Sequence, residues 1–267
     1  MKTVLIGDIH GRPYWKQIIE QEQDADRFVF VGDYFDSFTI PGVKQMDNFL
    51  DIIEFKESTD KEVVLLLGNH DYHYLPEIDE TGTSGYQTVM APTFKILLGE
   101  NKKHLQIAYQ FDDFVCSHAG LSSEWLDDIV GDWDVTNMVD KVNELFQNQP
   151  GLIAYRSFKM INETEWIGAR GYGEETFQGP IWIRPKALMA ANKSTQNGKL
   201  TNKETLKNFI RQVVGHTPQD QIDIEGKATG GRYYFIDTLE YGQSQYLIVK
   251  DGVVSLGKLE NEKAQTK

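Results

Sequence analysis

Carboxylates, one amide and several imidazoles recur in this chain directly after short apolar runs. In chain order the clusters are Asp8 with His10, Asp33 with Asp36, Asn69 with His70, then His118, and finally His216. Oxygen atoms of Asp and Asn, combined with imidazole nitrogen and without any thiolate, are a ligand set for divalent transition metals. The residue types therefore predict a metal centre, provided that the fold brings these distant residues together.

The apolar runs before the clusters indicate how the residues meet. These runs cover 4–6, 28–31, 63–67, 114–116 and 213–214, and glycine or a small residue stands near each end. Short apolar runs of this kind are typical of strands buried on both faces. In open α/β sheets, sites form beyond the carboxyl ends of the strands. Every cluster stands at that end of its run, so we expect all of them to converge.

The segments between the runs predict the rest of the fold. Residues 14–23 and 43–55 have helical spacing of apolar residues, which gives a β-α-β-α-β order and a mainly parallel sheet with helices outside. Apolar runs from residue 233 onward, joined by short turns, indicate a second sheet that is antiparallel. We expect a loop over 187–201 and a helix over 203–211.

Composition excludes several functional classes. The chain has 267 residues, is 40% hydrophobic and carries a formal charge of -13. This acidity argues against binding to nucleic acid or to an anionic membrane. The single cysteine, Cys116, excludes an internal disulfide framework and suits a reducing compartment. With no signal peptide or membrane span in the pattern, we expect a cytoplasmic protein with a single domain over 1–267, including a mainly helical and loop insertion at about 121–180.

The ordered motifs identify a family resemblance. GD-x-H-G, GD-x-x-D, GNH-D, a later His-x-Gly and a final GH-x-x occur in that order, and four of the 6 histidines fall within them. This series resembles the signature of the calcineurin-like metallophosphoesterases. The resemblance implies an α/β fold, a four-layer α-β-β-α sandwich with two mixed sheets.

The resemblance also implies roles for the motif residues. Asp8 and His10 would bind a first metal, and Asp33 would bridge it to a second metal. The remaining ligands of the second metal would be Asn69, His118 and His216. His70 would protonate the leaving-group oxygen, and Asp36 would orient and charge its imidazole. A histidine held by a carboxylate is a competent proton donor near neutral pH.

Three details resemble the branch of bacterial and phage serine/threonine protein phosphatases and diadenosine tetraphosphate hydrolases. They are Ser-His-Ala-Gly-Leu at 117–121, Gly-His-Thr-Pro at 215–218 and Trp-Ile-Arg at 182–184. Arg184 would then clamp the phosphate through its guanidinium fork, and the alternative is a surface arginine at a strand end. Protein phosphatases of this branch have an arginine directly after Asp36, where this chain has Ser37. Either Arg12 or Arg170 is a candidate to replace it.

We therefore expect a binuclear metal-dependent phosphoesterase that uses a metal-bound hydroxide on a phosphomonoester or phosphoprotein. The alternative is a dinucleoside polyphosphate hydrolase, and a more distant one is a non-catalytic binding scaffold, which loss of ligands or of the acid histidine would mark. Mn²⁺ or Fe are the expected metals, with Zn²⁺ or Ni²⁺ as alternatives. The expected partner is a phosphorylated small molecule, nucleotide or phosphoprotein, and the sequence predicts no oligomeric state.

Overall fold

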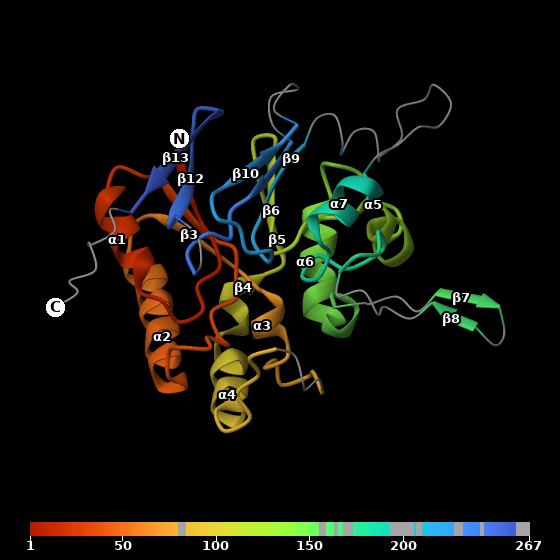
Figure 1. The fold of residues 1–267 in the computed structure, drawn as a ribbon, viewed down its shortest axis with the longest axis horizontal. Coiled ribbons are helices and arrows are strands. Elements are labelled where there is room, and N and C mark those ends of the chain that lie inside the picture. The colour runs from red at the N-terminus through yellow and green to blue at the C-terminus, as the bar shows by residue number, and fades with distance from the viewer. Residues whose placement is uncertain are drawn as a thin grey trace.

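Two mixed β-sheets lie at the centre of the protein, which we analysed as a computed structural model (Figure 1). The structure describes residues 1–79, 84–154, 159–162, 165–167, 173–192, 206, 210–226, 232–240 and 243–259. Arg170 lies outside these ranges, as does most of the helix predicted over 203–211.

The first sheet has six strands in the order β13-β12-β1-β2-β3-β4. Its strands are β1 (Lys2–Ile6), β2 (Arg27–Phe30), β3 (Glu62–Leu66), β4 (Leu105–Gln106), β12 (Gln245–Lys250) and β13 (Val253–Lys258). Strands β1 to β4 pair in parallel, whereas β12 pairs antiparallel with both β1 and β13. The predicted β-α-β-α-β unit forms the parallel part of this sheet.

The second sheet has five strands in the order β10-β11-β9-β6-β5. Its strands are β5 (Ala108–Phe111), β6 (Phe114–Ser117), β9 (Arg211–Val214), β10 (Asp223–Glu225) and β11 (Tyr233–Phe235). Strands β6, β9 and β11 run in parallel, and the edge strands β5 and β10 are antiparallel to their neighbours. A separate antiparallel pair consists of β7 (Lys159–Asn162) and β8 (Glu165–Ile167).

Helices cover the outer faces of both sheets. The described helical segments are α1 (Tyr14–Gln21), α2 (Gly42–Ser58), α3 (Asn69–Tyr72), α4 (Ala91–Asn101), η1 (Lys102–His104), α5 (Ser123–Trp125), η2 (Leu126–Val130), α6 (Met138–Asn148), η3 (Pro150–Leu152) and α7 (Pro185–Ala191). In Figure 1, α1, α2 and α4 lie on the side of the six-stranded sheet, and α6 and α7 lie on the other side.

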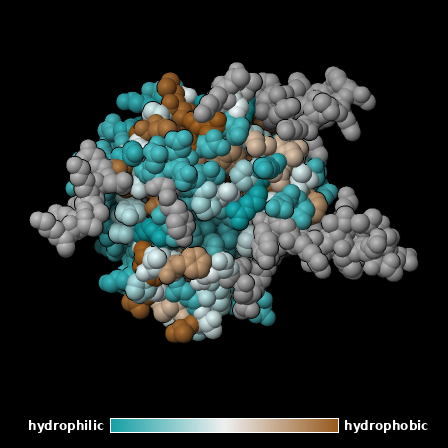
Figure 2. Space-filling model, viewed as in Figure 1, coloured by the Kyte–Doolittle hydropathy of each residue, from teal (hydrophilic) through white to brown (hydrophobic). Residues whose placement is uncertain are grey.

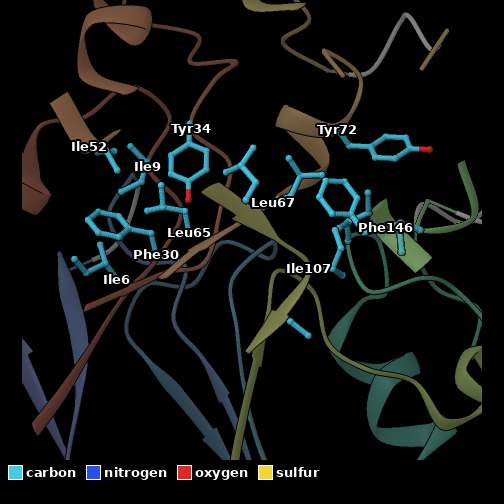
Figure 3. Close-up of a cluster of buried hydrophobic side chains, with 14 of the residues drawn as sticks. Ile6, Ile9, Phe30, Tyr34, Ile52, Leu65, Leu67, Tyr72, Ile107 and Phe146 are labelled. Atoms are coloured by element: carbon cyan, nitrogen blue, oxygen red, sulfur yellow. The ribbon is translucent and has the colours of Figure 1, made fainter. Parts of the chain in front are cut away.

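Three hydrophobic clusters separate these layers. One is sandwiched between the sheets, where Leu5 and Val29 meet Phe114 and Val213. The opposite faces of β1 to β3 pack against α1, α2 and α4, and Figure 3 shows part of this cluster. The outer face of the five-stranded sheet packs against α7. The order helix, sheet, sheet, helix confirms the predicted four-layer α-β-β-α sandwich.

Two expectations about the C-terminal half were wrong. The apolar runs after residue 233 do not form a sheet of their own, because β11 extends the five-stranded sheet and β12 with β13 extends the six-stranded one. Strand pairing over a long sequence separation leaves no mark in the local pattern. Residues 187–191 of the loop expected over 187–201 instead belong to α7, which Pro185 begins, and residues 193–201 lie outside the described residues. Proline at the first helical turn lacks only a donor that would have no partner there.

The face of the protein seen in Figure 2 is mostly polar. Figure 2 shows a face covered mainly by hydrophilic residues, with hydrophobic residues gathered in small areas toward its upper and lower ends. None of the helices in the described ranges combines the length and apolar character of a membrane span. The predicted single domain with an insertion at about 121–180 stays a prediction.

Candidate metal centre

The motif residues of the two sheets meet beyond the carboxyl ends of the parallel strands. Asp8, Asp33 and His118 follow β1, β2 and β6, and each offers a ligand atom within 4.8 Å of the other two. His216 follows β9, and its backbone N–H donates to Asp8 Oδ2 at 3.0 Å across a separation of 208 residues. Both sheets therefore contribute to one group of side chains.

The other predicted ligands join this group directly. His10 Nε2 lies 3.6 Å from Asp33 Oδ2, and His118 Nε2 lies 3.4 Å from the same oxygen. Asn69 Oδ1 lies 2.9 Å from His118 Nε2 and 2.9 Å from His216 Nδ1. The fold thus brings together all six residues expected to hold metals.

Each of the three histidines has one ring nitrogen against a backbone carbonyl. His10 Nδ1 lies 2.6 Å from the Phe35 oxygen, and His118 Nδ1 lies 2.9 Å from the Val31 oxygen. His216 is reversed, with Nε2 lying 3.0 Å from the Trp182 oxygen. A carbonyl can only accept, so these nitrogens carry the proton and the other nitrogen of each ring turns a lone pair to the site. Metal-binding histidines are oriented in this way.

The protonation states also fit a cation. Burial lowers the pKa of His10 and of His118, and burial together with the nearby His118 and Arg184 lowers that of His216 well below its usual value. Burial raises the pKa of Asp33, but the imidazoles of His118, His70 and His10 more than offset this and hold it below its usual range. Neutral imidazole and ionised carboxylate are the forms that bind metals.

Carboxylates crowd one side of the site. Burial raises the pKa of Asp8 well above its usual value, and the neighbouring Asp237 and Asp33 raise it further. Asp237 hydrogen bonds to Asp8, and burial with the charges of Asp33 and Glu240 raises the pKa of Asp237 to about 7. A bound divalent cation would be the largest local charge and would reverse this repulsion. The residues present therefore fit the metals that the motifs imply.

The backbone of the site is strained where it presents its side chains. His10, Asp33, Asp36 and His216 have φ values of 42°, 53°, 63° and 64°, in the left-handed region. Residues other than glycine adopt this region at a cost, and such residues cluster at functional sites. Glycine is required at 215, where a Cβ atom would lie 1.9 Å from Asp8 Oδ1.

Asp36 and His70 form a pair at the edge of the ligand group. His70 Nδ1 lies 3.0 Å from Asp36 Oδ2, and the hydroxyl of Tyr74 donates to Oδ1 at 2.6 Å. His73 Nε2 lies 2.8 Å from Asp36 Oδ2 as well. Burial lowers the pKa of His70, but Asp33 and Asp36 more than offset this and raise it to about 9. This raised pKa favours the protonated imidazole near neutral pH.

Asp71 connects two of the motif loops. Its carboxylate accepts from the backbone N–H groups of Asp33 at 2.8 Å, Tyr34 at 2.7 Å and Gly68 at 2.9 Å. The backbone N–H of His70 in turn donates to Asp33 Oδ1 at 2.9 Å. The final residue of GNHD thus fixes the loop that presents Asp33.

Two of the three candidate arginines lie in the described residues. Arg184 Nη1 donates to Thr217 Oγ1 at 3.2 Å and to the His216 oxygen at 3.4 Å, which holds its guanidinium beside a predicted ligand. Arg12 Nη2 donates to Glu240 Oε1 at 2.6 Å. Arg170 lies outside the described part of the chain.

Sequence reasoning did not identify Asp237, Glu240 or Tyr74 as part of the site. Asp237 had a signal, because it follows the apolar run of β11 as the other aspartates follow theirs. Glu240 and Tyr74 lie in irregular or short segments with no motif, so only the folded structure places them.

Comparison with known proteins agrees with this geometry. A crystal structure of a cold-active protein tyrosine phosphatase from a Shewanella species is 18% identical, with a TM-score of 0.58 over 96% of this chain and 77% of that chain. A mutant of a cold-active protein tyrosine phosphatase has a TM-score of 0.61 at 18% identity, over 96% and 77%. A serine/threonine protein phosphatase from Saccharomyces cerevisiae is 12% identical, with a TM-score of 0.57 over 99% and 82%.

These likenesses establish the fold, and no curated protein matches the sequence. The family model for the calcineurin-like phosphoesterase domain matches residues 1–220, which is most of the chain. The chain therefore belongs to the calcineurin-like phosphoesterases and is a metal-dependent phosphoesterase.

Proposed function

We propose that this phosphoesterase hydrolyses phosphomonoesters, and that a phosphoprotein is its substrate class. The observation that carries the proposal is the pair of His70 and Asp36 beside the ligand group, in which His70 Nδ1 lies 3.0 Å from Asp36 Oδ2. Its ring lies 5.2 Å from that of His10, centroid to centroid. An alkoxide leaving group, as from a serine ester, requires a proton from such an acid. When a phosphate anhydride is cleaved, the leaving group is itself a phosphate, which departs more readily than an alkoxide. Hydrolysis of a dinucleoside polyphosphate therefore has less need of the His70–Asp36 pair.

The similar structures give the proposal further support. Those proteins are named as protein tyrosine and protein serine/threonine phosphatases. Their identity to this chain is low, so the phosphoprotein assignment rests on the acid pair first and on the likeness second.

We further propose a division of the ligands between two metals. Asp8, His10 and Asp33 would hold the first, and the second would be held by Asp33, Asn69, His118 and His216. Mn²⁺ or Fe suit this mixture of oxygen and nitrogen ligands, with Zn²⁺ or Ni²⁺ as alternatives. When bound, such a pair neutralises phosphoryl charge and lowers the pKa of a bound water.

The chain's own residues then bind the ester and supply the proton. Arg184 would bind two phosphoryl oxygens through its planar guanidinium. His70 would give its proton to the leaving oxygen, while Asp36 keeps the imidazole oriented and charged. Tyr74 and His73, both against Asp36, would hold that carboxylate in place.

A substrate panel under Mn²⁺ tests the proposed function. Phosphoseryl and phosphotyrosyl peptides, p-nitrophenyl phosphate, diadenosine tetraphosphate and cyclic nucleotides would be compared by kcat/KM. We expect a phosphopeptide to be the best substrate. Preference for diadenosine tetraphosphate would favour the alternative hydrolase. No turnover with any divalent metal, together with no metal uptake, would favour a binding scaffold.

The role of Arg184 is tested separately by Arg184→Gln. Loss of one charge-assisted contact, about 1.5–3 kcal/mol, should lower kcat/KM for the best substrate by roughly 10- to 150-fold. The matched control is Arg27→Gln, because Arg27 pairs with Glu62 in the six-stranded sheet and lies outside the site. Equal, small effects of both substitutions would show that Arg184 only stabilises the loop.

A further inference from the structure

Glu240 lies between an arginine and the first-metal side of the site. It follows β11 in the loop after Asp237, and its side chain is only 8% exposed. Its Oε1 accepts from Arg12 Nη2 at 2.6 Å, and its Oε2 lies 4.0 Å from His10 Nε2. One oxygen of the carboxylate therefore faces a guanidinium and the other faces an imidazole.

The nitrogen that Oε2 faces is the ring nitrogen of His10 that is turned toward the site. His10 Nδ1 is bound to the Phe35 carbonyl at 2.6 Å and carries the ring proton, so Nε2 presents a lone pair. A carboxylate oxygen opposite a lone pair is electrostatically unfavourable unless a cation lies between them. Asp33 Oδ2 faces the same nitrogen at 3.6 Å.

We propose that Glu240 is an additional ligand of the first metal, through Oε2, an inference that rests on the proposed function of this site. Two atoms that bind one cation through bonds of about 2.1 Å can lie no more than about 4.2 Å apart. His10 Nε2 lies 3.6 Å from Asp33 Oδ2 and 4.0 Å from Glu240 Oε2, so both separations are below this limit.

Arg12 is the residue that positions Glu240. Besides its ion pair with Oε1, it donates from Nη1 to the backbone oxygen of His10 at 3.2 Å. The guanidinium thus connects the loop after β11 to the loop after β1. Arg12 and Glu240 are separated by 228 positions in the sequence. This use of Arg12 as a positioning residue differs from the phosphate clamp that the sequence left open.

The proposal changes the charge of the first metal's ligands. With Glu240, three carboxylates surround that position, namely Asp8, Asp33 and Glu240, and His10 is the single imidazole. Carboxylate-rich shells favour Mg²⁺ and Mn²⁺ over softer metals. Without Glu240 the shell would contain two carboxylates, one of them shared.

The test measures metal binding and activity on the same samples. Chelator-treated wild type, Glu240→Gln and Glu240→Asp would be titrated with Mn²⁺ by calorimetry and by electron paramagnetic resonance of the free ion. We expect two sites in wild type and, at one site in Glu240→Gln, a loss of affinity larger than the roughly 10- to 100-fold that removal of an outer-shell partner causes. Glu240→Asp, which keeps a carboxylate, should recover part of that loss.

Two further variants separate ligation from charge pairing. Arg12→Gln should weaken the same Mn²⁺ site less than Glu240→Gln does, because the ligand remains. Glu62→Gln is the matched control, since Glu62 pairs with Arg27 at 2.7 Å outside the site, and its titration should equal that of wild type.

The outcomes distinguish this inference from the proposed function. If wild type turns over p-nitrophenyl phosphate and binds two Mn²⁺, but Glu240→Gln binds both equally well, Glu240 is only the counter-ion of Arg12 and the inference is overturned. If wild type neither binds Mn²⁺ nor hydrolyses the ester, the proposed function fails and the inference fails with it.

Discussion

The proposed metal centre has two halves, one for each cation, and they differ in charge and in origin. The first half, around Asp8 and His10, is crowded with carboxylates because Asp237 and Glu240 lie beside it. The second half presents Asn69, His118 and His216, which are neutral. The first half takes its motif residues from the loop after β1, whereas the second draws on β3, β6 and β9 in both sheets.

This difference indicates that two cations would be held by different physical means. In the first half, a bound cation would relieve repulsion between buried carboxylates, so charge would contribute most of the attraction. In the second half, the lone pairs of the imidazole and amide groups would provide most of the attraction. This requires the two sheets to keep a fixed position relative to each other. Asp33 belongs to both halves, since its Oδ2 faces both His10 and His118.

The largest expected effect comes from removing the residue that the halves share. Asp33→Asn replaces a carboxylate by an amide that cannot neutralise two cations, so we expect loss of the metal pair and of turnover together. Metal content by mass spectrometry and p-nitrophenyl phosphate hydrolysis would measure both. A fully active variant with two metals would contradict the bridging role.

His70→Asn should leave both halves intact and remove only the acid. Metal content should equal that of wild type, while esters with poor leaving groups slow by about 10²- to 10⁴-fold. Nitrophenyl esters, whose leaving group needs no proton, should slow far less. Equal slowing of alkyl and nitrophenyl phosphates would argue that His70 has another role.

Unequal charge also predicts that metals leave in two steps. Ligand charge strengthens binding of hard cations. A limiting amount of chelator should therefore first remove the metal of the second half, whose own ligands are an amide and two imidazoles. Electron paramagnetic resonance of the Mn²⁺-loaded protein would follow the change from a coupled pair to a single ion. Simultaneous loss of both ions at every chelator concentration would mean that the halves do not differ in affinity.

The sequence predicts the position of a site residue when that residue stands at the end of a regular strand. Asp8, Asp33 and His118 were predictable because a buried strand before each fixes where its side chain must lie. The four-layer fold followed from the same runs together with the family resemblance. The prediction that β12 and β13 belong to a second sheet was wrong. β12 pairs with β1 from the other end of the chain, and the local sequence pattern does not reveal such a distant pairing.

The residues that sequence could not supply are those whose position depends on tertiary contacts. Glu240 lies in an irregular loop, where it pairs with Arg12 and faces His10. Tyr74 meets Asp36 because α3 and the β2 loop are tied together by Asp71. No local periodicity or motif indicates such tertiary contacts, so only the folded structure reveals them.

The acidic half makes a smaller prediction about stability and pH. Asp237 has a pKa of about 7 in the folded protein, against about 3.9 for an ordinary aspartate. A carboxyl group with a raised pKa in the folded state holds its proton more tightly when folded, so its contribution to stability is full below about pH 4 and is lost as pH rises through about 7. Asp237 by itself should therefore lower the unfolding temperature of the metal-free protein by roughly 5–10 °C between pH 5 and pH 8. The buried histidines, whose pKa values are lowered, contribute in the opposite direction.

Asp237→Asn and added Mn²⁺ isolate the cause of that pH dependence. The amide cannot ionise, so calorimetry of the metal-free variant should show a smaller fall between pH 5 and pH 8 than wild type. Mn²⁺ should raise the unfolding temperature of wild type more at pH 8 than at pH 5, because the cation offsets charges that exist only at the higher pH. If instead Mn²⁺ stabilises wild type equally at both values, and Asp237→Asn has the same pH slope, the carboxylates of the first half do not repel one another in the folded protein. The contrast between the halves would then reduce to ligand type alone.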